Sequence, residues 1–172
     1  MKRTDINQAP NYFDRYINLI DDISLNEAFQ ESLDALASFD WVAAEAIGTR
    51  TYAPNKWTIA DILQHLIDWE RILTFRTLVY VREAGVSTAS MDENLLAKNA
   101  ASKPKTIATL VEELTLLRQS TRLFFKDMDN EDLQKVGKTG RLKMSVLAMG
   151  FTMLGHQMHH FSIIRERYLN LH

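Results

Sequence analysis

The sequence contains no cysteine and only three prolines among its 172 residues. Without cysteine the chain can form no disulfide, offer no thiolate to a metal and use no cysteine nucleophile, and this composition fits a reducing compartment. The prolines, Pro10, Pro54 and Pro104, all lie outside the long periodic stretches of the sequence. Proline therefore breaks none of these stretches, and each can form an uninterrupted helix.

The sequence also lacks a strong charge of either sign and any long hydrophobic run. The net charge is −2, with acidic and basic residues interspersed, so no basic patch is present to follow a phosphate backbone, and we expect no nucleic-acid partner. Charged residues interrupt every apolar segment, so we expect no membrane span. The first residues carry charge without a following apolar run, so we expect no signal peptide and a cytoplasmic location.

Apolar residues recur at the three-to-four spacing of amphipathic helices in four stretches. These stretches cover approximately residues 25–39, 58–84, 106–128 and 143–169. No run alternates with period two over enough residues to predict a strand. The sequence therefore predicts an all-α protein with a single domain over residues 1–172 and a helical core over about 25–169.

The second and fourth stretches are each ~40 Å long at 1.5 Å per residue, and matched long helices favour a four-helix bundle. The connection over residues 85–105 is longer than a helical hairpin requires. Fully extended it could reach ~70 Å, so it can return along the whole bundle. The second and third helices would then run parallel, which predicts an up-down-down-up order.

Two histidines replace core residues in the fourth stretch. The inward positions of that helix read Val146, Met149, Met153, His156, His160, Ile163 and Arg167. Because His156 and His160 are four residues apart, they lie one turn apart on the same face. A helix offers two imidazoles to one metal ion with this spacing.

His65 occupies a core position in the second stretch, in a row with Ile62, Trp69 and Ile72. It lies ~10 Å from the start of its helix, while His160 and His156 lie ~14 and ~20 Å from the end of theirs. Antiparallel second and fourth helices therefore place the three histidines at similar heights. The sequence predicts a divalent-metal site there, and three core histidines satisfied by hydrogen bonds are the alternative.

Other charged residues could assist this site or support the fold. Asp61 and Asp68 share the helical face of His65 and could orient its imidazole or act as acid or base on a bound water. The alternative is that both are solvated acids near a helix start. Arg76 could bind an anionic substrate, but we favour an ion pair with Glu112 or Glu113. Arg118 and Arg122 are expected to point outward.

Two segments are expected to form the mouth of the pocket. Tyr52, Lys56 and Trp57 precede the second helix and fall at the end of the bundle where the histidines lie. The segment Asp92-Glu93-Asn94 would reach the same end if the long connection returns. The methionines at 149, 153 and 158 are interpreted as flexible core filler rather than as metal ligands.

Two blocks of the sequence resemble the conserved blocks of DinB-like proteins. The first is Tyr-Ala-Pro-Asn-Lys-Trp-Thr-Ile at 52–59 with the segment 63–71 around His65, and the second is Gly-His-Gln-Met-His-His at 155–160 with the segment 163–168. The resemblance implies a four-helix bundle, often a homodimer, with His65, His156 and His160 as ligands of nickel, zinc or a similar ion. Gln157 and Asp61 stand where relatives often carry Glu.

This resemblance implies a metal-dependent enzyme. The superfamily includes transferases that use low-molecular-weight thiols such as bacillithiol, and a metal that activates the thiolate of a cosubstrate suits a chain without cysteine. We therefore predict a metal-dependent transferase or hydrolase of a small molecule, whose ion activates a thiol or water. The alternative is a non-catalytic, stress-related, dimeric domain that binds a metal or ligand. Three imidazoles suit zinc, nickel, iron and copper alike.

Overall fold

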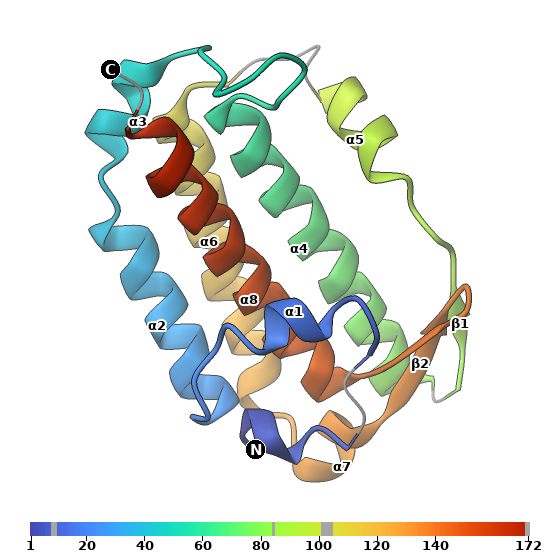
Figure 1. Ribbon diagram of the computed structural model, residues 1–172. Coiled ribbons are helices and arrows are strands. Elements are labelled where there is room, and N and C mark those ends of the chain that lie inside the picture. The colour runs from blue at the N-terminus through green and yellow to red at the C-terminus, as the bar shows by residue number, and fades with distance from the viewer. Residues whose placement is uncertain (8–9, 84, 101–104, 171–172) are drawn as a thin grey trace.

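The computed structural model describes residues 1–7, 10–83, 85–100 and 105–170. Four long helices dominate it: α2 (Leu25–Ser38), α4 (Ile59–Arg82), α6 (Ile107–Lys126) and α8 (Val146–Ile163), which continues into a π-helical turn, η2 (Ile164–Tyr168) (Figure 1). Each starts at a serine or threonine whose hydroxyl accepts a hydrogen bond from the backbone of the first turn: Ser24, Thr58, Thr106 and Ser145. These side chains satisfy amide groups that the first turn of a helix leaves without a partner.

The long helices form the predicted up-down-down-up bundle. In Figure 1, α4 and α6 run in the same direction and α2 and α8 run in the opposite one. Both α4 and α2 pack against α6 and α8. The long connection after α4 passes through β1 (Ser87–Thr88) and α5 (Glu93–Ala100), and α5 packs against α4. The return of this connection along the bundle explains why consecutive helices can run parallel.

Short elements complete the fold. They are η1 (Arg3–Asp5), α1 (Asp14–Ile17), α3 (Trp41–Ile47), α7 (Asn130–Gln134), β2 (Val136–Thr139) and β3 (Leu142–Ser145). Strand β1 pairs with β2 in parallel and β2 pairs with β3 in an antiparallel hairpin. The expectation of a chain without strands was therefore wrong, because strands of two to four residues are too short to show period-two alternation.

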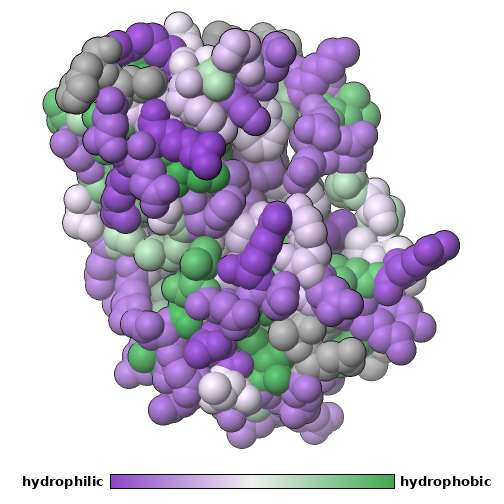
Figure 2. Space-filling model, in the orientation of Figure 1, coloured by the Kyte–Doolittle hydropathy of each residue, from purple (hydrophilic) through white to green (hydrophobic). Residues whose placement is uncertain are grey.

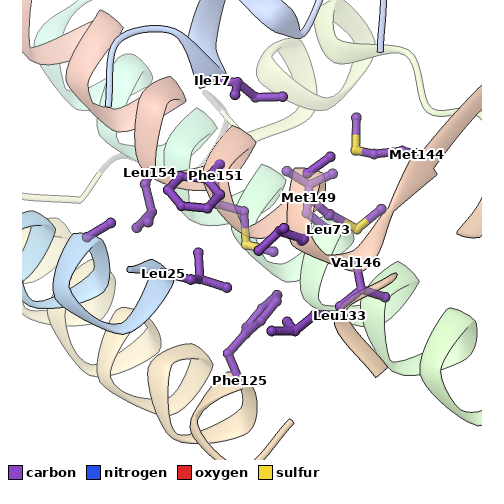
Figure 3. Close-up of a cluster of buried hydrophobic side chains, with 14 of the residues drawn as sticks. Ile17, Leu25, Leu73, Phe125, Leu133, Met144, Val146, Met149, Phe151 and Leu154 are labelled. Atoms are coloured by element: carbon purple, nitrogen blue, oxygen red, sulfur yellow. The ribbon is translucent and has the colours of Figure 1, made fainter. Parts of the chain in front are cut away.

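Two hydrophobic clusters fill the bundle, one toward the sheet and one toward α3. Figure 3 shows the first, where side chains from α1, α2, α4, α6 and α8 meet. Met149 and Met153 belong to this cluster and are each 2% exposed, as expected for core filler. Ile17 of α1 also lies in it, so residues before the predicted core contribute to it.

A buried polar network connects the four long helices between these clusters. Arg118 of α6 donates two hydrogen bonds, of 2.9 and 2.8 Å, to the carboxylate of Glu70 on α4. Arg118 also donates to the hydroxyl of Ser32 on α2, and Gln157 of α8 donates to the Ser32 carbonyl over 2.9 Å. Both charged side chains are only 2% exposed.

Arg118 was expected to point outward, and the structure corrects this. The residue falls on the apolar stripe of α6, between Leu114 and Phe125, and so faces the core. Charged side chains are rarely buried without a partner, and its partner, Glu70, lies on another helix where helical periodicity does not reveal it.

The face shown in Figure 2 is mostly hydrophilic, with small hydrophobic patches between the polar residues. Within the part of the chain that the structure describes, no helix combines the length and the apolar character that a membrane crossing requires.

We predict that Arg118→Leu lowers the free energy of unfolding by about 3–5 kcal/mol, because it leaves the Glu70 carboxylate buried without a partner. The matched control is Arg71→Leu, which removes the 2.8 Å ion pair between Arg71 and Glu113. This pair also joins α4 to α6, but the Arg71 side chain is 50% exposed. This loss should stay below about 1 kcal/mol. Chemical denaturation measures both, and equal small losses would contradict the account.

Candidate metal centre

Helices α4 and α8 bring His65, His156 and His160 together inside the bundle. The Nε2 atom of His156 lies 3.0 Å from Nε2 of His65 and 3.0 Å from Nε2 of His160. One ring nitrogen from each histidine lies within 4.8 Å of the other two. The three side chains are 6%, 9% and 8% exposed. The convergence that the sequence predicted from helix direction and height is therefore present.

Close packing of the neighbouring elements fixes these imidazoles. A Cβ atom at Gly155 would lie 1.9 Å from the carbonyl oxygen of Tyr16, so only glycine lets α1 pass this closely over α8. The ring of Tyr16 then packs edge-on against His156, with 5.1 Å between centroids. The ring of Trp57, just before α4, has its centroid 4.7 Å from that of the His65 ring.

Burial keeps the three imidazoles uncharged. Desolvation lowers the pKa of His65 from 6.5 to about 4 and, together with the neighbouring histidines, lowers that of His160 to about 3. The pKa of His156 is also well below its usual value, mainly through desolvation. At neutral pH each ring therefore keeps a nitrogen lone pair, which a metal ligand requires.

Hydrogen bonding alone does not satisfy this cluster. An imidazole nitrogen carries either one hydrogen or one lone pair in the ring plane, so His156 Nε2 cannot make a good hydrogen bond to both neighbours. The Nδ1 atom of His160 is buried and has no hydrogen-bond partner among the described residues. Nitrogen ligands of an ion with bonds of about 2.0–2.1 Å lie roughly 3.0–3.4 Å apart, and the two separations from His156 Nε2 are 3.0 Å each. The group could thus hold a divalent metal ion.

Each histidine also lines a separate cavity. The cavity beside His156, here called the Trp69 cavity, has a volume of about 340 Å³ and is lined by Tyr12, Phe13, Tyr16, Trp69, Leu73, Met91, Asp92, Glu93, Thr152 and His156. The Tyr52 cavity beside His160, of about 280 Å³, includes Tyr52, Asn55, Lys56, Trp57 and Asn94. The Asp61 cavity beside His65, of about 320 Å³, includes Asp61, Gln64, Asp68, Ala97, Ala100 and Lys105.

The predicted mouth segments line these cavities. Tyr52, Lys56 and Trp57 lie beside His160, and residues from Met91 to Ala100 contribute to all three cavities. The expectation that the long connection reaches the histidines is therefore confirmed. Arg76 of α4 binds the first part of this connection, because it donates a hydrogen bond of 3.0 Å to the Ala89 carbonyl.

Asp61 and Asp68 line one cavity with His65 but already hold other partners. Asp61 Oδ2 accepts hydrogen bonds from the Thr58 amide and hydroxyl, at 2.9 and 2.7 Å, and so completes the capping box of α4. Asp68 Oδ1 accepts one of 2.8 Å from Gln64. Among the described residues, neither carboxylate is hydrogen-bonded to a histidine.

The expected ion pair between Arg76 and Glu112 or Glu113 was wrong. Glu113 instead accepts from Arg71 at 2.8 Å and Lys105 at 2.6 Å. Arg76 is buried on the face of α4 that meets the returning connection, where its guanidinium lies 5.6 Å from the Trp69 ring centroid.

Tyr12, Phe13 and Tyr16 are site residues that the sequence analysis missed. They lie in and before α1, a four-residue helix that is too short to show periodicity. Their clustering as three aromatic residues within five positions was the available signal.

The fold and the site define a four-helix-bundle protein with a candidate three-histidine metal centre. The family model of the DinB superfamily matches residues 11–164, and the chain belongs to this superfamily.

Among solved structures, YfiT from Bacillus subtilis, described as a probable metal-dependent hydrolase with an unusual four-helix bundle topology, is similar. The TM-score is 0.66 and the identity 15%, over 90% of this chain and 84% of that chain. This likeness confirms the fold. No curated protein matches the chain.

We predict that acid destabilises the metal-free protein through these histidines. In the unfolded chain their pKa values return to about 6.5, so protonation favours unfolding below that pH. The free energy of unfolding should have its full value above about pH 6.5. As the pH decreases toward 5, it should fall by roughly 1.4 kcal/mol per pH unit for each histidine. Denaturation at several pH values should give a shallower slope for His160→Leu, and an unchanged slope would contradict the burial argument.

Proposed function

We propose that the protein is a metal-dependent enzyme that hydrolyses a small molecule, with His65, His156 and His160 holding one divalent ion. The convergence of three buried, uncharged imidazoles on one point carries this proposal. The description of the similar YfiT structure as a probable metal-dependent hydrolase supports it. The cavities beside the histidines favour catalysis over a purely structural site, because a structural metal is usually enclosed by four protein ligands.

The histidines and the nearby acids are proposed to have different roles at the site. When bound, a divalent ion would act as a Lewis acid and activate a nucleophile. The three imidazoles bind the ion and leave the rest of its surroundings to the cavities, and the aromatic walls beside His156 exclude water. Asp61 and Asp68, which share a cavity with His65, are proposed to orient its ring or to accept a proton there.

Thiol transfer is the second candidate reaction. The Tyr52 and Asp61 cavities offer space for a second organic molecule, with polar groups such as Lys56 and Gln64 in their walls. A low-molecular-weight thiol would bring the sulfur that a chain without cysteine lacks. We propose zinc or nickel as the ion, since imidazole suits both, and a homodimer as the assembly.

The first test is the metal content of untagged protein, measured by mass spectrometry. Wild type should hold close to one divalent ion per chain, and His65→Ala and His160→Ala should each lose it, because two imidazoles bind far more weakly than three. His159→Ala is the matched control, since this neighbouring histidine lies outside the group of three. A wild-type chain that holds no ion and takes up none on addition would overturn the proposal.

A second test asks whether the carboxylates serve the site. Asp68→Asn should lower metal affinity by about 10- to 100-fold if the carboxylate orients His65, as partners of metal-bound histidines commonly do. Asp61→Asn should show the same effect if that residue has the role instead. Competition with a chelator measures both affinities. Wild-type metal affinity in both variants would contradict a role of either acid at the metal site.

A further inference from the structure

We propose that the Trp69 cavity is the substrate pocket and that it selects an aromatic ring. The cavity shares His156 with the candidate metal centre, so a ring held here would place its substituent beside the three imidazoles. The inference rests on the proposed function only for the position of the reacting group, because the cavity is present whether or not an ion is bound.

The walls of the cavity favour a flat apolar group. Four of its lining residues are aromatic: Tyr12, Phe13, Tyr16 and Trp69. Tyr12 meets Phe13 at 80° with centroids 5.2 Å apart and meets Tyr16 at 87°, so the cluster presents both ring faces and ring edges. Aromatic rings pack favourably against both, in stacked or edge-to-face arrangements. Leu73 and Met91 complete the apolar surface.

The size of the cavity suits a ring with a substituent. Its volume is about 340 Å³. A dry apolar cavity of about 150 Å³ holds a benzene molecule, so this cavity can accept one ring and a side group of similar size. It lies near the lower end of the volumes typical of small-molecule sites, so a large polymer does not fit.

Without a bound ion, the charged side chains that line the cavity are acidic. Asp92 and Glu93 are the charged residues that line it, and His156 is held uncharged by burial. The Asp92 carboxylate accepts hydrogen bonds from the amides of Asn94 and Leu95, whereas Glu93 makes no hydrogen bond or ion pair with a described residue. Glu93 is thus free to attract a cation.

The two nearby cations are already held by the protein. Arg15 donates to the Tyr16 hydroxyl over 2.7 Å and lies 3.9 Å from the Tyr12 ring centroid. Arg76 is bound to the Ala89 carbonyl and lies near the Trp69 ring. Neither arginine lines the cavity, so the pocket itself presents carboxylates and rings to a ligand.

The test uses three probes that share one ring: benzyl alcohol, benzylamine and benzoate. Ligand-observed NMR on full-length protein, with and without added zinc, gives the affinity of each. Benzyl alcohol should bind in both forms. In the zinc-free form benzylamine should also bind, and benzoate should bind at least about fivefold more weakly, because two carboxylates line the cavity. Glu93→Gln should weaken benzylamine by about two- to fivefold and leave benzyl alcohol unchanged.

Ring variants locate the binding site. Trp69→Leu and Tyr12→Leu should each weaken benzyl alcohol by about three- to tenfold, because each removes one aromatic wall. Tyr12 is 55% exposed, so this variant keeps the test valid if Trp69→Leu fails to fold. Phe75→Leu is the control, because Phe75 lies on the same helix as Trp69 but is 58% exposed and outside the cavity.

The outcomes separate this inference from the proposed function. If the probes bind but the chain takes up no added metal, the proposed function alone fails. Failure of all three probes to bind a chain that holds its ion would overturn the pocket alone. Equal effects of Trp69→Leu and Phe75→Leu on benzyl alcohol would also overturn it, and equal binding of benzoate and benzylamine by the zinc-free form would contradict the role of Glu93.

Discussion

The antiparallel pairing of α4 with α8 is the constraint on which the rest of the structure depends. His65 lies near the start of α4, and His156 and His160 lie toward the end of α8, so the three rings meet only if these helices run in opposite directions. A shift of one residue between the helices moves the rings ~1.5 Å past each other, enough to break a metal site. The long connection through β1 and α5 makes this arrangement possible, since it carries the chain back before α6 begins.

The interior of the bundle holds several polar and charged side chains. Three imidazoles and the Arg118–Glu70 pair are all less than one-tenth exposed. Burying such groups costs free energy that hydrophobic burial elsewhere must offset. The ion pair recovers much of its cost through hydrogen bonds that reach α2 and, through Ser32, Gln157 of α8. The histidines contact one another through their Nε2 atoms but make no comparable bonds to side chains of other described residues, and this group could hold a metal ion.

Helical periodicity predicted the parts of this fold that repeat along the chain. It gave the four helices, and it identified His65, His156 and His160 because each replaced an apolar residue at a core position. It failed where a contact depends on a distant residue or on a short element. The side chain of Arg118 was predicted to point outward because its partner lies on another helix. The sheet and the aromatic residues in and before α1 were missed because segments of two to five residues show no period.

The most direct test of the central claim is an anomalous diffraction experiment on crystals grown with zinc, at the zinc absorption edge. The account predicts one strong peak per chain, about 2.0–2.1 Å from the Nε2 atoms of His65, His156 and His160. A map without a peak at this position, with the three imidazoles still packed against one another, would contradict it.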